Sequence, residues 1–250
     1  MLITSTQNSL IKEVLALRKT RKESDLILID GMREIQRALS AGVKIEKIFY
    51  SSKLLIDFDK SKLVEVSEKV FEKITYGERG TGAVALARVF PRKLSDLKLP
   101  SNPFVVVLES VEKPGNLGAI VRTCDGAGVD ALLICDPKTD IYNPNVIRAS
   151  TGTVFHVPVA AGTNEQIADF LQRKKISVAG AFPEAAKVYT QANLKGPLAL
   201  ALGTEDKGLS PFWQKRCDQK LKIPMQGWAD SLNVSVSAAI LIYEARRQRS

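Results

Sequence analysis

Three short polar stretches contain the residues whose types and spacing could support chemistry. The first is ESVEKPGNLGAIVRTCDGAG, in which Asn116 and Gly118 stand where a helix is expected to begin and Arg122 follows on the same helix. Asn116 at such a place can equally be a helix cap. Arg122 follows three apolar residues and therefore needs an anionic partner, for which phosphate is well suited.

The second stretch, ALALGTEDKGLSP, brings Glu205 and Lys207 between Gly203 and Gly208. It lacks the GxxxxGK[ST] pattern of a phosphate-binding loop, so on its own it is typical of a plain turn with surface charges. The third stretch, IPMQGWADSLN, leads into the last helix, where Ser231 and Asn233 could each cap the helix or bind a ligand. Each stretch alone could be an ordinary loop. Only the presence of all three in this order indicates a functional site.

Alternating strands and helices must position these stretches. The run FVVVLESV, from residue 104, is continuously apolar, as expected of a parallel strand buried on both faces. A helix over about 116–127, the strands ALLICD, ISVAGAF, PLALALG and LKIPM, and a final helix follow. This order predicts an α/β fold with a mostly parallel sheet. All three polar stretches follow strands, and ligands bind beyond the carboxyl ends of parallel strands.

A smaller α/β unit precedes this sheet. Its expected elements are a helix near 8–20, the strand LILID, a helix over about 32–41, the strand IEKIFY, a further helix and strand, and a strand in 82–89. The proline-rich stretch PRKLSDLKLPSNP has no sustained periodicity, which is typical of a linker between two folded units. We therefore expect a first domain at 1–95, a linker at 96–102 and a second domain at 103–250.

The three stretches together resemble the SpoU (TrmH-like) branch of the SPOUT methyltransferases, enzymes that methylate RNA at the ribose 2′-oxygen with S-adenosylmethionine. The family's first motif corresponds to Asn116, Gly118 and Arg122, and its second to Gly203, Glu205 and Gly208. Its third motif corresponds to residues 223–225 and 231–239. The first 95 residues also resemble the small substrate-binding domain, similar to a ribosomal RNA-binding protein, that precedes many SpoU enzymes, although Asp30 replaces the glutamate usual there.

The resemblance implies a deep trefoil knot formed by the C-terminal segment, and a site that holds S-adenosylmethionine. Arg122 is the residue expected to act on the ribose and phosphate, and a guanidinium group stays protonated near neutral pH, which argues against its being the base. The other expected catalytic residues are Asn116, Glu205, Ser231 and Asn233. The expected cofactor-binding residues are Leu202, Gly203, Thr204, Glu205, Gly208, Ile223, Met225, Ser231, Leu232 and Asn233. No metal is expected.

The resemblance further implies a homodimer, paired through the C-terminal domain, and structured RNA as the partner, with ribosomal RNA favoured over transfer RNA. The net charge of +9 agrees with an anionic partner, and residues 1–100 contribute +6 of it, from 19 basic and 13 acidic groups. A transfer RNA 2′-O-methyltransferase and a non-catalytic RNA-binding member of the fold are the alternatives. A dinucleotide-binding enzyme is disfavoured because the first strand-to-helix turn lacks GxGxxG.

Other residues that could attract a functional reading have simpler explanations. His156, the single histidine, lies in the apolar stretch TVFHVPV outside all three motifs. For Trp213 packing or a dimer contact is favoured, whereas Trp228, beside the third motif, could stack on a base. The three cysteines have no metal-ligand spacing and should be small buried hydrophobes. With no membrane-spanning run and no signal-peptide pattern, we expect a cytoplasmic protein without a membrane partner.

Overall fold

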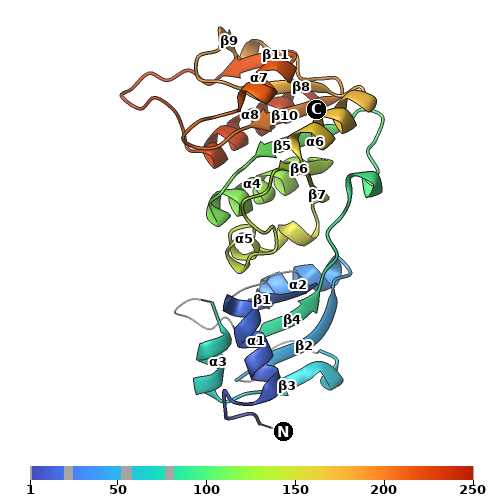
Figure 1. Cartoon of the computed structure of the whole chain (residues 1–250), viewed down its shortest axis with the longest axis vertical. Coiled ribbons are helices and arrows are strands. Elements are labelled where there is room, and N and C mark those ends of the chain that lie inside the picture. Colours follow the sequence, from blue (N-terminus) through green and yellow to red (C-terminus); the bar gives the residue numbers. More distant parts are fainter. Residues whose placement is uncertain (1, 20–24, 52–57, 77–81, 250) are drawn as a thin grey trace. The chain divides into compact units, whose positions relative to one another are not determined.

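The computed structural model describes residues 2–19, 25–51, 58–76 and 82–249 of the chain (Figure 1). Two compact units divide the chain: Met1–Phe90 with Tyr142–His156 form the first, and Pro91–Ile141 with Val157–Ser250 form the second. The segment Tyr142–His156, inside the predicted 103–250 domain, thus belongs to the first unit. Helix α5 (Pro144–Ala149) in that segment contacts strand β1 (Leu26–Asp30), and Arg37 Nη1 donates to the Thr151 carbonyl oxygen across 2.6 Å.

The first unit is built on a four-stranded mixed sheet of order β1-β4-β2-β3. Strand β4 lies between β1 and β2 and is antiparallel to both, and β2 and β3 run parallel. Its remaining elements are β2 (Lys44–Tyr50), β3 (Leu63–Glu65), β4 (Val84–Arg88), α1 (Ser9–Lys19), α2 (Met32–Ser40) and α3 (Glu68–Ile74), with short 3-10 turns at Lys60–Lys62 and Thr153–Phe155.

The core of the first unit follows from the sequence pattern. Ile11 and Val14 of α1 and Val70 of α3 are buried against Leu28 and Leu86 of the sheet. The predicted strands and the helix near 32–41 are confirmed, as is the helix near 8–20, whose last predicted residue lies outside the described residues. The further helix and strand expected before residue 82 are α3 and β3, but in the opposite order, with the strand first.

The second unit contains a seven-stranded sheet of order β7-β6-β5-β10-β8-β11-β9, in which every neighbouring pair is parallel. Its strands are β5 (Phe104–Glu109), β6 (Ala131–Cys135), β7 (Val159–Gly162), β8 (Ser177–Ala181), β9 (Lys187–Val188), β10 (Leu198–Leu202) and β11 (Gln219–Lys222). Its α-helices are α4 (Pro114–Ala127), α6 (Asn164–Arg173), α7 (Pro211–Arg216) and α8 (Val234–Arg249), and 3-10 turns occupy Leu94–Asp96 and Tyr189–Gln191.

The central strands β5, β6 and β10 are buried along their whole length because helices cover both faces of the sheet (Figure 1). The predicted α/β class with a mostly parallel sheet is therefore confirmed. One boundary is wrong: the last strand ends at Lys222, so Ile223–Met225 already belong to the loop that follows.

Helices α4 and α8 pack against each other, and α8 also contacts β10. Small side chains permit this close packing: a Cβ atom on Gly126 of α4 would lie only 3.1 Å from the Tyr243 Oη of α8. The knot implied by the family resemblance stays a prediction. No helix within the described part of the chain is both long and apolar enough to span a bilayer.

Candidate active site

The three polar stretches of the sequence meet at one edge of the second unit's sheet. They follow β5, β10 and β11, and because all strands are parallel their carboxyl ends lie on the same side. The buried carboxylate of Glu109, at the end of β5, accepts hydrogen bonds from the Ser210 amide (2.7 Å) and hydroxyl (2.6 Å). This contact holds the far end of the loop after β10 against the neighbouring strand.

The loop after β10 is a tight glycine turn. Thr204 and Gly208 form an isolated antiparallel bridge with amide-to-carbonyl distances of 3.1 and 3.0 Å, and Gly208 has a φ of +63°. A Cβ atom on Gly203 would lie 2.0 Å from the Gly208 carbonyl oxygen. Glycine is therefore required at 203 by packing and favoured at 208 by backbone conformation.

A pocket of about 320 Å³ opens between this turn and the loop after β11. It is lined by every expected cofactor-binding residue except Asn233: Leu202, Gly203, Thr204, Glu205, Gly208, Ile223, Met225, Ser231 and Leu232. Its volume is in the range of small-molecule sites, and apolar side chains share the wall with exposed backbone groups. The structure thus brings together residues from two of the sequence motifs.

Sequence reasoning missed one wall of this pocket. Ala181, Phe182, Pro183 and Glu184, at the end of β8, line it together with Val234 and Ser237 of α8. The signal was present in the sequence, because ISVAGAF was already predicted as a strand of the same parallel sheet. Its carboxyl end had to reach the same edge as those of β10 and β11.

Of the two residues that could cap helix α8 from the sequence, Ser231 and Asn233, it is Asn233 that does so. The Asn233 Oδ1 atom accepts hydrogen bonds from the Ser235 amide (2.9 Å) and hydroxyl (2.7 Å), and the helix begins at Val234. Ser231 lies too early in the chain to cap and instead lines the pocket. The Asn233 Nδ2 atom donates to Asn116 Oδ1 across 3.3 Å, which joins the first and third motifs.

Asn116 lies in the first turn of α4, whose cap position is occupied by Lys113. The reading of Asn116 as a cap is therefore wrong. Its Nδ2 atom is buried and has no hydrogen-bond partner within the described residues. A buried amide donor without a partner is costly in a native protein and points to a ligand that accepts from it.

Arg122 lies on α4 with an exposed side chain. Its guanidinium group forms neither an ion pair nor a hydrogen bond within residues 2–19, 25–51, 58–76 and 82–249. Its helix neighbours Ile120 and Val121 are fully buried, so the arginine occupies the solvent side of α4. The anionic partner expected from the sequence is thus not supplied by this part of the protein.

Glu205 lies in the glycine turn and forms an ion pair with Lys113, which precedes α4. The other carboxylate oxygen, Oε1, is buried and lacks a hydrogen-bond partner among the described residues. A second cavity of about 150 Å³ lies beside this pair, lined by Val111, Glu112, Lys113, Thr204, Glu205, Asp206, Lys207 and Val234. Five of these residues, Thr204 to Lys207 and Val234, also line the larger pocket, so Glu205 contributes to both.

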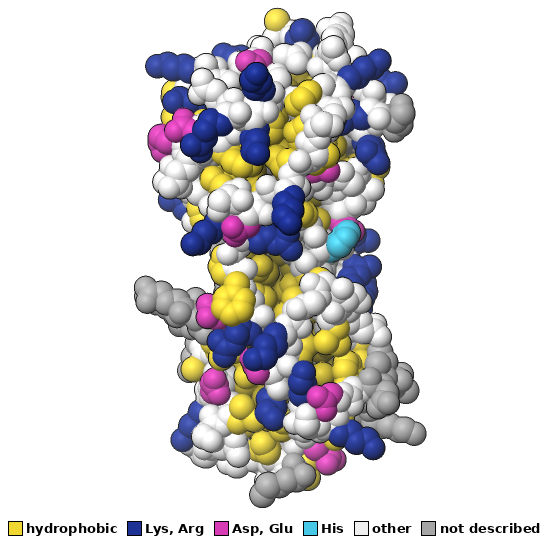
Figure 2. All heavy atoms as spheres, turned by 90° about the vertical axis from the view of Figure 1, so that its right-hand side faces the viewer, with side chains coloured by type: hydrophobic (Ala, Val, Ile, Leu, Met, Phe, Trp, Pro, Cys, Tyr) yellow, Lys and Arg dark blue, Asp and Glu magenta, His cyan; other side chains and the backbone are white. Residues whose placement is uncertain are grey.

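The remaining candidates have the following positions. Trp213 is fully buried and donates from Nε1 to Asn164 Oδ1 (2.6 Å), as expected for packing. Trp228 is fully exposed on the loop after β11, and the single histidine, cyan in Figure 2, lies on the surface of the first unit. Two cysteines are buried and the third is half-buried, and burial raises their thiol pKa values, to about 12 for Cys217. No cluster of metal-ligating side chains occurs within the described ranges.

Residues 103–243 match the model of the SpoU rRNA methylase family, which covers more than half of the chain. The chain belongs to the SpoU rRNA methylase family. Residues 8–85 match the MRM3-like substrate-binding domain. The family and the N-terminal domain expected from the sequence are therefore confirmed.

Relatives within this SpoU family match over nearly the whole chain. The 23S rRNA (guanosine(2553)-2′-O)-methyltransferase RlmP of Bacillus subtilis is 29% identical over 249 residues, 98% of each chain. A crystal structure of an RNA 2′-O ribose methyltransferase is 40% identical, with a TM-score of 0.87 over 100% of this chain and 99% of that one. An AdoMet-bound rRNA methyltransferase from Sinorhizobium meliloti is 27% identical, with a TM-score of 0.89 over 99% of this chain and 97% of that one.

Proposed function

We propose that the protein transfers the methyl group of S-adenosylmethionine to the 2′-hydroxyl of one ribose in structured ribosomal RNA. The observation that carries this proposal is the pocket between the glycine turn after β10 and the loop after β11. Beside it the first and third motifs meet through Asn116 and Asn233. The same residue sets define the SpoU resemblance, and the relatives that match the whole chain are named RNA or rRNA methyltransferases.

The pocket fits S-adenosylmethionine in size and chemistry. Leu202, Ile223 and Leu232 offer apolar surface, and the backbone of the glycine turn can approach a ligand closely because Gly203 and Gly208 carry no side chain. Ser231 and Met225 complete the wall from the loop after β11. When bound, the cofactor supplies a sulfonium methyl group that is already activated for transfer.

The protein's own contribution is orientation and electrostatic stabilisation. The exposed guanidinium of Arg122 is available for the phosphate and the ribose of the target nucleotide, where it stabilises the negative charge that develops on the 2′-oxygen. The unpartnered Nδ2 of Asn116 and Oε1 of Glu205 are a donor and an acceptor, and a ribose hydroxyl can bond to both kinds of group. Asn233 caps the start of α8 next to the pocket that Ser231 lines.

The test is methyl transfer from radiolabelled S-adenosylmethionine to ribosomal RNA by the purified protein. A 2′-O-methylated nucleotide resists alkaline cleavage, so one protected position in the ladder is the expected result. A methylated base in place of a ribose would overturn the assignment. Binding of RNA and cofactor without turnover would favour a non-catalytic RNA-binding protein. Labelling of transfer RNA alone would favour a transfer RNA 2′-O-methyltransferase.

The predicted domain at about residues 1–95, which supplies most of the first unit, is proposed to bind the RNA, and a short linker at 96–102 is proposed to join it to the catalytic part. Lysine and arginine side chains are distributed over the face shown in Figure 2, interspersed with acidic ones. Hydrogen exchange of the full chain tests this role: RNA should protect amides in the first unit, whereas S-adenosylmethionine should protect only the second. Because the substrate is ribosomal RNA, we place the protein in the cytoplasm.

We also propose a homodimer through the C-terminal part of the chain. Val236 and Tyr243 of α8 are 46% and 53% exposed, and residues seven apart lie on the same face of a helix. An exposed apolar stripe of this kind is typical of a protein–protein interface. A second copy is its expected occupant, and the deep knot implied by the family is proposed for each subunit.

A further inference from the structure

Lys113 and Glu205 link the first and second polar stretches by an ion pair. The two residues are 92 positions apart in the chain and come from the loops after β5 and β10. The Lys113 side chain is 70% exposed and that of Glu205 only 23%. The hydrogen bond that the Lys113 ammonium donates to the Glu205 carboxylate is the main reason that the pKa of Lys113 is raised above its usual value. Lys113 is not part of any of the three sequence motifs.

The ion pair determines which carboxylate oxygen of Glu205 is left for a ligand. Lys113 Nζ contacts Oε2, whereas Oε1 is buried and unpartnered within the described residues. A carboxylate can only accept hydrogen bonds, so Oε1 needs a donor, and burial makes the lack of one costly. The charged groups that line the adjoining cavity are Glu112, Asp206 and Lys207, in addition to the pair itself.

We propose that Lys113 is a positioning residue for methyl transfer: by holding Oε2 of Glu205, it directs Oε1 inward to accept a hydrogen bond from the bound ribose. This inference rests on the proposed function. Without the lysine, Glu205 is free to rotate its carboxylate toward water, and Oε1 is then no longer held where it can accept a hydrogen bond from the ribose. Lys113 itself needs no contact with RNA or cofactor for this role.

A double-mutant cycle tests the proposal with single-turnover methyl transfer at saturating RNA and cofactor. Lys113→Met should lower the rate roughly 10- to 100-fold, the size of effect expected when a catalytic group is misplaced. Lys113→Arg keeps an ion pair and should restore most of the rate. In a Glu205→Gln background, Lys113→Met should cause no further loss, because the lysine acts only through the carboxylate.

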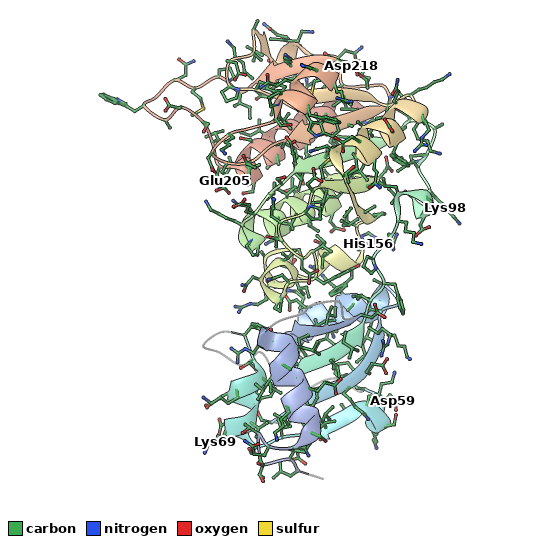
Figure 3. The ribbon with its side chains drawn as sticks, viewed as in Figure 1. Asp59, Lys69, Lys98, His156, Glu205 and Asp218 are labelled. Atoms are coloured by element: carbon green, nitrogen blue, oxygen red, sulfur yellow. The ribbon has the colours of Figure 1, made fainter. Side chains whose placement is uncertain are left out.

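Lys98→Met is the matched control for loss of one positive charge. Lys98 is an exposed residue of the same unit that lies far from Glu205 in Figure 3, so its removal should leave the rate unchanged. Additive losses in the cycle, or a raised KM for RNA with unchanged saturated rate, would overturn the proposal and make Lys113 a phosphate contact. Absence of any transfer by the wild-type protein would instead contradict the proposed function, so the two failures are distinguishable.

Discussion

Asn233 donates a hydrogen bond from Nδ2 to the Oδ1 of Asn116 across 3.3 Å, and so ties the start of α8 to the first turn of α4. The same side chain caps α8 through its oxygen. One amide group therefore serves both the stability of a helix and the geometry of the site. These two roles can be separated by substitution.

Asn233→Ala removes both interactions and should lower the free energy of unfolding by about 1 kcal/mol, the usual cost of losing a cap. Asn233→Ser keeps a capping oxygen but is too short to reach Asn116. We therefore expect the serine variant to unfold like the wild type in urea and yet to transfer methyl groups more slowly. A serine variant with the wild-type rate would show that the bridge to Asn116 is unnecessary.

Gly203 tests the structural basis of the pocket. Gly203→Ala places a Cβ atom 2.0 Å from the Gly208 carbonyl oxygen, so the turn must open. Overpacking of this kind should cost about 1–3 kcal/mol of stability, and calorimetry should show much weaker binding of S-adenosylmethionine. Gly196→Ala is the control, because nothing lies within 4 Å of its added Cβ atom. Unchanged cofactor affinity in Gly203→Ala would separate this turn from the cofactor site.

Val236 tests the proposed homodimer. Val236→Glu puts a charge on the exposed apolar stripe of α8, and sedimentation should then show the 27.4 kDa monomer in place of a dimer. Leu39→Glu, on an exposed leucine of the first unit, should leave the association unchanged. A wild-type protein that sediments as a monomer at micromolar concentration would contradict the dimer itself.

Trp228 is fully exposed on the segment between β11 and α8, which extends away from the second unit's sheet (Figure 1). Met225 and Asp230, on either side of Trp228 in the chain, line the pocket, so the loop that carries the exposed indole begins and ends at the proposed site. Trp228→Ala should weaken RNA binding roughly 10-fold, since stacking is worth about 1–3 kcal/mol per base. Trp228→Phe should retain most of the affinity. If RNA binding is unchanged and the dimer weakens, the residue belongs to the interface.

The central part of the fold was predictable because continuous apolar runs mark strands that are buried on both faces. Strands β5, β6, β8 and β10 are recognisable in this way. The edge strands β7 and β9 are not, because they have only 4 and 2 residues and no sustained pattern. Helix α6 carried a readable signal in its capping box, Thr163 with Gln166, which the sequence analysis did not use.

The site was predictable only as far as its motifs. Phe182 and Glu184 belong to no motif and enter the pocket because β8 pairs with β10. The pairing of Lys113 with Glu205 depends on how two loops meet, which residue spacing does not reveal. The order of strands in the sheet determines which distant segments of the chain come into contact. That order depends on tertiary packing, which local sequence patterns do not reveal.

Arg122 provides the sharpest test of the catalytic assignment. Its side chain is exposed, and none of the ion pairs or hydrogen bonds described for the chain involves it, so Arg122→Ala should leave the fold and the cofactor affinity nearly intact. If its guanidinium stabilises charge on the ribose in the transition state, the rate of methyl transfer should fall by orders of magnitude. Cofactor binding by calorimetry serves as the control for folding.

Arg122→Lys distinguishes two ways in which the arginine could act. Lysine keeps the positive charge but lacks the planar pair of donors that bind a phosphate or a ribose oxygen in two-pronged fashion. Little recovery of the rate with lysine therefore indicates bidentate contact, whereas substantial recovery indicates simple charge attraction. Near-normal turnover of Arg122→Ala at saturating RNA and cofactor would remove Arg122 from the mechanism altogether, and the unpartnered groups of Asn116 and Glu205 would then have to orient the ribose without it.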